Sequence, residues 1–294
     1  MTDSSIRAKV IVNRDSKPRK IKRYLKPALH ILRMNGFRLS VYFTKQAGEV
    51  LPVTRKAVEQ GFKAIIIAGG DGTTNEAING IVPNDVPLGI LPFGGSNVVG
   101  RELSIPLNPI HAAEVIARRY TRQIDLGVAQ GRYFAMMVGC GYDAYAISRT
   151  SKRIKKIISR YAYVWAGFKD FFGYRPTEIN LVLDNGKVHE KGTFVVVSNC
   201  HFYGGSHEMT PFAEVDDGFL DILIYQGKSQ FGLARFVINM FNRQHLRMKK
   251  VRYYRIRKAE ISSEKHTHIQ VDGDPLGELP MTIEIAPKAL RVFC

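Results

Sequence analysis

Residues 63–80 have the sequence KAIIIAGGDGTTNEAING, and this stretch determines which fold the chain can form. Residues 64–68 are apolar and rich in β-branched side chains, which is typical of a strand buried on both faces. A glycine-rich turn follows, with Gly69, Gly70 and Gly72. Thr73 or Thr74 can cap the helix expected next. Because a helix N-terminus offers unpaired N–H groups and partial positive charge, the stretch predicts a phosphate-binding turn.

Asp71 is a carboxylate inside this predicted phosphate site. It would repel a phosphate unless a divalent cation lies between them or the carboxylate takes a proton from the attacking group. Either role indicates phosphoryl transfer. The alternative is an ordinary strand-to-helix turn without a ligand.

A second turn of the same kind follows another buried strand. Residues 86–93 (VPLGILPF) predict the strand, and the turn leads into a helical VVGREL through Gly94, Gly95, Ser96 and Asn97. Two such turns at the carboxyl edge of a parallel sheet would hold one polyphosphate from two directions. The first turn lacks GxGxxG, and GxxxxGK[ST] is absent from the chain. GCGYDA at 139–144 matches GxGxxA by spacing only, since it lacks the acidic partner.

The pattern of elements changes near residue 125. Before it, predicted strands alternate with helical stretches; the strands are 8–13, 38–43, 64–68 and 87–92, and the helices are 18–34, 48–60, 73–80 and 108–119. This predicts a doubly wound parallel α/β domain. After it, strand-like runs at 178–199, 219–226, 251–263 and 281–286, with a hairpin turn at Asp184-Asn185-Gly186, predict a mostly antiparallel β domain. We expect a nucleotide cleft between the two.

Composition fits a cytoplasmic protein of about two domains. The 294 residues are 45% hydrophobic, and Cys140, Cys200 and Cys294 show neither metal-ligand spacing nor a disulfide pattern. The N-terminus has no apolar signal region, and no apolar run reaches the roughly 20 residues of a spanning helix. Any membrane contact is therefore expected to be peripheral.

The chain is strongly basic, with 43 Lys and Arg against 26 Asp and Glu. At 149–172 an expected helix has an aromatic stripe that includes Trp165, with cations mostly off it at Lys152, Lys155, Lys156 and Arg160. This predicts a membrane-surface helix, although a helix packed over the domain junction fits equally. A second basic block covers residues 243–258 and predicts a strand with one basic face. Because the aromatic residues are not interleaved with the cations, an anionic membrane fits better than nucleic acid.

Five ordered segments resemble the diacylglycerol kinase catalytic-domain family of bacterial lipid kinases, which is related to sphingosine and ceramide kinases and distantly to NAD kinases. They are GGDGTTNEAINGI (69–81), GILPFGGSNVVGREL (89–103), IDLGVAQGRYFAMMVGCGYDA (124–144), PFAEVDDGFLDILI (211–224) and VDGDPLGELP (271–280). The resemblance implies an α/β nucleotide-binding domain at 1–124, a β-rich lipid and metal-binding domain at 125–289, and a return to the first domain at 290–294.

It also implies an ATP-dependent kinase that phosphorylates the hydroxyl of a membrane lipid, with diacylglycerol the leading candidate. Alternatives are a sphingoid base, ceramide, phosphatidylglycerol or another lipid alcohol. A catalytically silent basic protein that docks on membranes or nucleic acid is a third interpretation. The implied location is the inner face of the membrane, with Mg²⁺ as cofactor, no nucleic-acid partner, and a homodimer left open.

The implied nucleotide-binding residues lie on the two glycine turns and two further loops: Asn13, Ser16, Thr44, Gly69, Gly70, Asp71, Gly72, Thr73, Asn75, Gly94, Gly95, Ser96 and Asn97. The chain departs from the family pattern in two of these loops. The usual NPxSG-like loop is NRDSK here, with Arg14 and Lys17, and the second turn has Gly95 for the usual threonine and Val98 for an acidic residue. These departures leave the nucleotide preference open.

Two carboxylates compete for the role of general base, which must reach the lipid hydroxyl. Bacterial relatives carry a DGE motif whose glutamate is the base, and here Asp272-Gly273-Asp274 puts an aspartate there. We favour Asp274 as the base, with Asp71 binding the catalytic metal through water. In the sphingosine and NAD kinase branches the residue matching Asp71 is the base instead.

An acidic loop is a candidate for a structural magnesium ion. Glu214, Asp216 and Asp217 offer hard oxygen ligands, although composition alone would favour a solvated turn. The resemblance implies that they hold the ion together with the backbone near Phe219. His266 and His268 lack a third ligand with metal spacing and are interpreted as surface residues.

Overall fold

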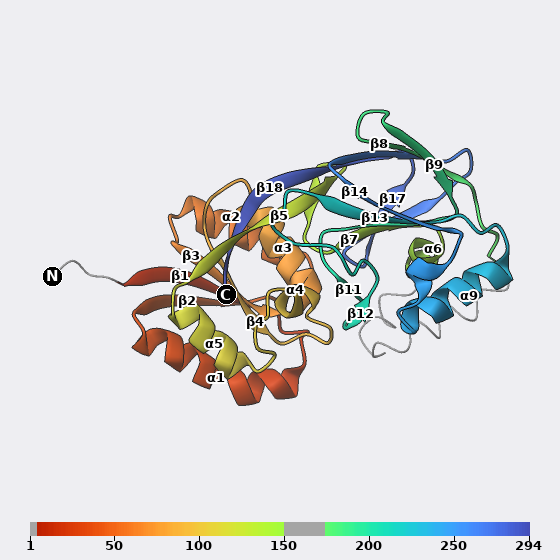
Figure 1. Cartoon of the computed structure of the whole chain (residues 1–294). Coiled ribbons are helices and arrows are strands. Elements are labelled where there is room, and N and C mark those ends of the chain that lie inside the picture. The colour runs from red at the N-terminus through yellow and green to blue at the C-terminus, as the bar shows by residue number, and fades with distance from the viewer. Residues whose placement is uncertain (1–4, 150–173) are drawn as a thin grey trace. The chain divides into compact units, whose positions relative to one another are not determined.

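The computed structural model describes residues 5–149 and 174–294 (Figure 1). The chain forms two compact units, of which the first is Met1–Ile124 with Lys288–Cys294 and the second is Asp125–Pro287. The sequence predicts boundaries after residues 124 and 289, whereas the units divide after residues 124 and 287.

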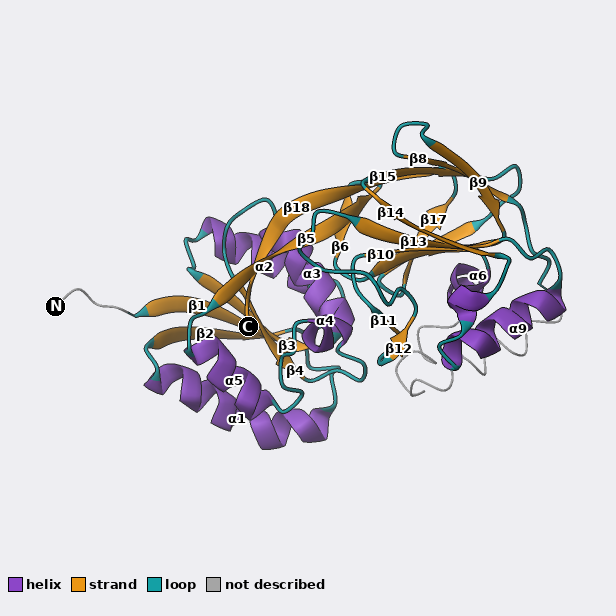
Figure 2. Cartoon of the chain, viewed as in Figure 1, coloured by secondary structure: helices purple, strands orange, loops and turns teal. Residues whose placement is uncertain are grey.

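The first unit is a parallel sheet with helices on both faces. Its strands are β1 (Ile6–Val12), β2 (Phe37–Phe43), β3 (Ala64–Gly69), β4 (Leu88–Pro92) and the end of β18 (Met281–Phe293), in the order β2-β1-β3-β4-β18. Its helices are α1 (Pro18–Met34), α2 (Val50–Glu59), α3 (Asp71–Ile81), α4 (Val98–Glu102) and α5 (Pro109–Ala117). Figure 2 shows α1 and α5 on one side of the sheet and α2 and α3 on the other. This is the predicted doubly wound layout.

Apolar spacing explains these elements. Every residue of β3 is buried, as expected for a central strand covered by helices on both sides. α1 starts with Pro18 in its first turn and buries Leu25, Ala28, Leu29 and Leu32, which recur at three- and four-residue spacing. The expected helix at 73–80 instead begins at Asp71, with Gly70 as its N-cap. The expectation that Thr73 or Thr74 caps it is therefore wrong, because both lie inside the helix.

The second unit is an antiparallel β-sandwich. One sheet has the order β14-β13-β10-β7-β16-β17 and contains β14 (Val251–Ile256), β13 (Leu220–Tyr225), β10 (Phe194–Ser198), β7 (Met137–Cys140), β16 (His268–Val271) and β17 (Asp274–Glu278). The facing strands are the first part of β18, β15 (Lys258–Ser262), β8 (Ile179–Leu183) and β9 (Val188–Gly192). Alternate apolar residues of both layers form one buried core, including Val195, Ile222, Leu181 and Ile261.

Further strands and helices complete the described part of the second unit. They are β5 (Thr121–Ala129), which begins in the first unit, β6 (Arg132–Phe134), α6 (Tyr142–Arg149), the short pair β11 (Phe202–Tyr203) and β12 (His207–Glu208), α9 (Gln230–Phe241) and the 3-10 helix η1 (His245–Arg247). The Asp184-Asn185-Gly186 hairpin is confirmed, with all three residues at positive φ. Among the described residues, no helix combines the length and the apolar character that crossing a bilayer requires.

The basic strand expected within residues 251–263 is two strands in different sheets. β14 ends at Ile256, and the chain changes sheets at Arg257 before β15 begins. Arg255 and Arg257 both lie over the ring of Phe219, with their guanidinium carbons 4.7 and 4.8 Å from its centroid. Arg255 and Arg257 are nevertheless both exposed and share one ring, so these two cations lie on the same side although the strand is interrupted between them.

Candidate active site

The two glycine turns lie side by side at the carboxyl edge of the first sheet. β3 and β4 pair in parallel with Gly69 opposite Pro92, so the first glycine turn (residues 69–72) and the second (residues 94–97) leave the sheet together. A Cβ atom on Gly94 would lie 2.4 Å from Cα of Gly70, and a Cβ on Gly70 would lie 3.0 Å from Cα of Gly94. The two backbones thus touch where a side chain would keep them apart. This confirms the predicted adjacency of the turns.

Asn13 connects the loop after β1, which begins at this residue and is called the Asn13 loop, to the first glycine turn by hydrogen bonds. Its Nδ2 donates to Oγ1 of Thr73 at 2.9 Å, and its backbone N–H donates to the carbonyl of Ala68 at 3.0 Å. Its Oδ1 accepts the Asp15 N–H at 3.0 Å, and its carbonyl accepts the Ser16 N–H at 3.1 Å. Three of the predicted nucleotide-binding residues, Asn13, Ser16 and Thr73, therefore lie together. Their contacts order the backbone beside the turn.

Asn97 shapes the second glycine turn from within. It adopts a left-handed conformation with φ 48°, and its Oδ1 accepts the N–H of Gly94 at 3.0 Å. Its Nδ2 donates to the carbonyl of Gly94 at 3.1 Å, so both ends of the amide hold the turn. Gly95 is exposed and Ser96 is half-buried, which leaves these two residues accessible to a ligand. Arg101 Nε donates to the carbonyl of Ser96 at 2.9 Å, a support that the sequence did not indicate.

Asp71 links the two turns. It is the first residue of α3, and its Oδ1 accepts the N–H of Val98, the first residue of α4, at 2.6 Å. Burial raises the pKa of Asp71, while hydrogen bonds from the backbone N–H groups of residues 97–99 act in the opposite direction. The carboxylate therefore satisfies N–H groups at the start of α4 and is costly to ionise.

The other predicted nucleotide residues differ in accessibility. Gly72 is exposed, with open space where a Cβ would stand. Thr44 is buried, and its Oγ1 accepts the N–H of Arg14 at 3.4 Å. Asn75 is only 2% exposed, and its backbone oxygen accepts Nδ2 of Asn79 at 2.9 Å. We infer that Asn75 acts mainly in packing the first turn of α3.

Lys20 supports the backbone next to the second glycine turn, a role that the sequence alone did not indicate. Its Nζ donates to the carbonyls of Pro92 at 2.7 Å and Leu107 at 2.9 Å. Burial lowers the pKa of Lys20, and the charge of Lys17 acts in the same direction. The ammonium group thus ties α1 to the end of β4, directly before the second glycine turn.

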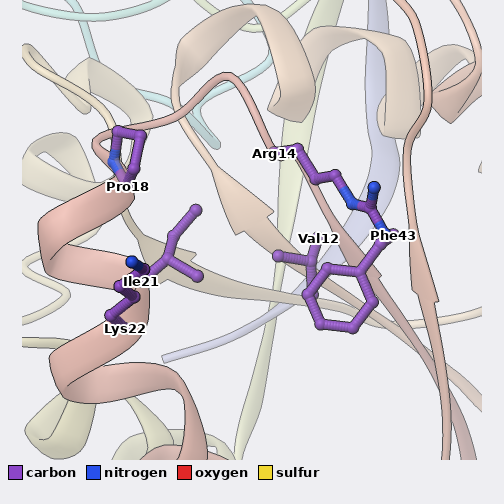
Figure 3. Close-up of a pocket in the computed structure, with 6 residues that line it drawn as sticks. All are labelled: Val12, Arg14, Pro18, Ile21, Lys22 and Phe43. Atoms are coloured by element: carbon purple, nitrogen blue, oxygen red, sulfur yellow. The ribbon is translucent and has the colours of Figure 1, made fainter.

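A pocket of about 220 Å³ lies beside the Asn13 loop (Figure 3). Its walls are Val12, Arg14, Pro18, Ile21, Lys22 and Phe43, and Figure 3 shows Ile21 of α1 opposite Val12 and Phe43. The guanidinium carbon of Arg14 lies 5.5 Å from the ring centroid of Phe43. The pocket is therefore an apolar space with cations at its edge, at the carboxyl ends of β1 and β2.

Asp272 and Asp274 have different surroundings in the hairpin between β16 and β17. Asp272 is buried, and its two oxygens accept the N–H groups of Ala135, Met136 and Met137 at 2.9–3.2 Å. The side chain of Asp274 is 51% exposed, and its Oδ2 lies 3.4 Å from Nη2 of Arg132. Asp272 therefore holds the fold, whereas Asp274 is accessible. Asp274 belongs to the second unit and Asp71 to the first, so the choice of base between them stays a prediction.

The three carboxylates of the acidic loop, at residues 214–217, have different surroundings. Asp217 accepts the N–H of Phe219 at 2.9 Å through Oδ1 and forms an ion pair with Arg255 through Oδ2. Glu214 is exposed and Asp216 is half-buried. Nowhere in residues 5–149 or 174–294 do three or more His, Cys, Asp or Glu side chains converge as a metal-ligand group. The structural ion, for which the resemblance implied the backbone near Phe219 as a further ligand, stays a prediction.

Asp125 organises this loop, although the sequence did not mark it as a site residue. It is fully buried, and its Oδ2 accepts the N–H of Gly218 at 2.6 Å. Its backbone N–H donates to the carbonyl of Val215, also at 2.6 Å. The loop is therefore held by a buried carboxylate from the start of the second unit.

The membrane-contact candidates lie outside the described residues: Lys152, Lys155, Lys156, Arg160 and Trp165. His266 is exposed and His268 is half-buried, and their Nδ1 atoms lie 2.6 and 3.4 Å from the carboxylate of Glu278. They are surface residues, as expected.

Comparison with known proteins gives matches over nearly the whole chain. Residues 7–129 match the diacylglycerol kinase catalytic domain, and residues 136–294 match the YegS C-terminal NAD kinase beta sandwich-like domain. The chain is 29% identical to a diacylglycerol kinase of Staphylococcus saprophyticus, over 98% of this chain and 95% of the relative. It is 28% identical to a diacylglycerol kinase of Staphylococcus epidermidis, over 98% and 92%.

Solved structures show the same fold. A crystal structure of a diacylglycerol kinase from Bacillus anthracis matches with a TM-score of 0.74 and 19% identity, over 99% of this chain and 97% of that one. A second structure from the same organism matches with a TM-score of 0.81 and 20% identity, over 98% and 94%.

Proposed function

The chain belongs to the diacylglycerol kinase family, whose members are phosphotransferases with an alcohol acceptor, and we propose that it transfers the γ-phosphoryl group of ATP to the hydroxyl of a membrane lipid. We propose diacylglycerol as the acceptor, which would give phosphatidic acid. The relatives named diacylglycerol kinase support this choice, since they align over 98% of the chain.

The contact between the two glycine turns is the observation that carries the proposal. Gly70 and Gly94 meet backbone to backbone beside the N-terminus of α3, where unpaired N–H groups and the helix dipole favour a phosphate. Gly72, Gly95 and Ser96 are accessible on these turns. The pocket beside the Asn13 loop offers apolar walls for the nucleoside part of the donor.

Phosphoryl transfer relies mainly on positioning and charge neutralisation. Magnesium bound with ATP would neutralise the phosphate charge, and the Asp71 carboxylate fits its water shell because it stands on the first glycine turn. The accessible carboxylate of Asp274 would accept the proton of the lipid hydroxyl. Arg132, which lies beside Asp274, would keep that carboxylate oriented.

We propose that the protein works in the cytoplasm, on the inner face of the membrane. The excess of 17 positive charges supports attraction to anionic lipid, at about 1 kcal/mol per basic residue near the surface. The basic aromatic segment at 149–172 remains a candidate contact. These proposals name no nucleic-acid partner.

A phosphate-transfer assay against a panel of lipid alcohols tests the proposal. The purified protein would receive radiolabelled ATP or GTP with diacylglycerol, a sphingoid base, ceramide or phosphatidylglycerol in detergent micelles. We expect labelled phosphatidic acid with ATP as the better donor. Transfer to another alcohol alone would identify that alcohol, in place of diacylglycerol, as the acceptor. No transfer to any alcohol would refute the proposed activity.

A pair of glycine variants tests whether the turn contact matters. Gly94→Ala puts a Cβ 2.4 Å from Gly70 and should lower turnover by about 10²-fold. Gly100→Ala is the matched control, because its Cβ would meet only an ordinary contact at 4.0 Å from Asn97. Equal turnover of the two variants would show that phosphate binding does not depend on the close contact between the turns.

A further inference from the structure

A single peptide group joins the end of β4 to the second glycine turn, and both of its polar ends are held. The N–H of Phe93 donates to the carbonyl of Gly69, in the first glycine turn, at 2.9 Å. The carbonyl of Pro92 accepts Nζ of Lys20 at 2.7 Å. Because the N–H and C=O of a trans peptide point in opposite directions, the two contacts hold this group from opposite sides.

Lys20 supplies a hydrogen bond at a place where the sheet no longer does. β18 pairs with β4 where Val292 lies opposite Leu88, earlier in the strand. Pro92 is the last residue of β4 and is buried. A buried carbonyl without a donor costs free energy, and the ammonium group provides that donor on the side away from β3. Lys20 therefore completes β4 at its carboxyl end.

The side chain of Lys20 is itself fixed by its surroundings. Its Nζ also donates to the carbonyl of Leu107 at 2.9 Å and lies 5.9 Å from the ring centroid of Phe93, which is fully buried. Leu107 directly precedes Asn108, the N-cap of α5. One ammonium group therefore joins the first turn of α1, the end of β4 and the start of α5.

The Pro92–Phe93 peptide determines where the second glycine turn begins. Gly94 follows it directly, and a Cβ on Gly70 would lie only 3.0 Å from Cα of Gly94. The accessible residues of the turn, Gly95 and Ser96, come next. A displacement of this peptide would therefore move the part of the turn that is proposed to meet the phosphates, and phosphate binding depends on where the backbone N–H groups stand.

We propose that Lys20 is a positioning residue of the nucleotide site: by holding the Pro92–Phe93 peptide, it sets the affinity of the second glycine turn for the phosphate groups of the donor. The inference rests on the proposed function, in which the two glycine turns bind the phosphates of ATP. Lysine suits this role because one ammonium group has three donors and can serve two carbonyls at once. Lys20 acts through the backbone and touches no reacting atom.

Calorimetric titration with ATP and magnesium, without lipid, tests this role. Lys20→Met keeps a side chain of similar length and removes the donors, so it should weaken ATP binding about tenfold. Lys20→Arg keeps donors and charge and should recover most of the affinity. Lys20→Gln, whose amide is too short to serve both carbonyls, should show the same loss and replaces Lys20→Met if that variant does not fold. Lys26→Met is the matched control, because Lys26 is exposed on the same helix, and it should bind ATP as the wild type does.

Further measurements separate positioning from a general loss of stability. Leu25→Val trims a buried side chain of α1 and should lower the melting temperature without weakening ATP binding. Inorganic tripolyphosphate should lose the same factor as ATP in Lys20→Met, because it has no nucleoside and contacts only the phosphate site. Hydrogen exchange at residues 94–98 should be faster in Lys20→Met than in Lys26→Met, because the start of the turn is no longer held.

The same titrations contain the results that would overturn the role of Lys20. These are equal ATP affinity of Lys20→Met and Lys26→Met, or equal weakening of ATP binding by Leu25→Val. A loss for ATP but not for tripolyphosphate would place the effect in the pocket beside the Asn13 loop instead. No ATP binding by the wild type would refute the nucleotide site together with this role. The titrations contain no lipid, so a failure of transfer to lipid alcohols would be seen separately in the detergent assay.

Discussion

Two carboxylates, one in each unit, are the candidates for the proposed general base, and their surroundings differ. Asp71 stands between two glycine turns, accepts the N–H of Val98 and has a pKa raised by burial. Asp274 is half exposed and pairs with Arg132 at 3.4 Å. A buried carboxylate with a raised pKa is costly to keep ionised, which is common at functional sites. We therefore propose the accessible Asp274 as the base, whereas the raised pKa of Asp71 is typical of a group at a functional site.

The largest expected effect comes from Asp71→Asn, which should lower turnover about 10³-fold. The amide keeps an oxygen for the N–H of Val98, so the melting temperature should stay close to that of the wild type. Steady-state kinetics and thermal unfolding check both parts. Asp71→Ala is the contrast, because it also removes the acceptor at the start of α4 and should cost about 1 kcal/mol of stability. Near-normal turnover of Asp71→Asn would remove Asp71 from the chemistry.

Asp274→Asn should lower turnover about 10²-fold with little change in nucleotide affinity, because it removes the proposed base and leaves the first unit unchanged. Kinetics at saturating lipid, with ATP varied, measure the two quantities separately. If this variant keeps its activity while Asp71→Asn has none, the role of base passes to Asp71.

Asp272→Asn tests whether the two carboxylates of the β16–β17 hairpin have different roles. Asp272 accepts three backbone N–H groups, and an amide would point donors at donors. We expect a loss of about 2 kcal/mol in the free energy of unfolding, measured by urea denaturation. Asp274→Asn, two residues away, should lose much less because its side chain faces solvent. Equal losses would show that the two carboxylates are not divided into structural and accessible roles.

The smallest effect concerns the pH dependence of stability. Because the folded pKa of Asp71 is raised, its contribution is fully present below the unfolded pKa of about 3.9 and is lost as pH rises through the folded pKa. The free energy of unfolding of the wild type should therefore fall relative to that of Asp71→Asn as pH rises from about 4. Urea denaturation of both proteins across this range measures the difference. A constant difference would contradict the burial of the charge.

Much of the first unit could be predicted because its signals are local. Apolar runs at β3 and β4 and the glycines after them specify two strands and two turns, and parallel strands end at the same edge. Helix α9, in contrast, was not predicted. Its apolar residues fall on both its packed and its exposed faces, at Phe236 and Ile238 for example, so no single stripe stands out.

The supporting contacts could not be predicted because their partners are distant in the sequence. Asp272 accepts N–H groups from residues more than 130 positions earlier, and Lys20 donates to the carbonyl of Pro92. The acidic loop also has a distant partner, since Asp217 forms an ion pair with Arg255 of β14. A carboxylate in the sequence does not show whether its oxygens are available to a metal.

The residues alone were enough to predict the family, an α/β domain followed by a mostly antiparallel β domain, and the glycine turns, because backbone chemistry at a turn depends on neighbouring residues. That Gly70 touches Gly94, and that Asp272 supports the fold while Asp274 stays accessible, became evident only from the folded chain. These properties depend on which distant groups meet, and hydrogen bonding and burial are settled only when the chain has packed.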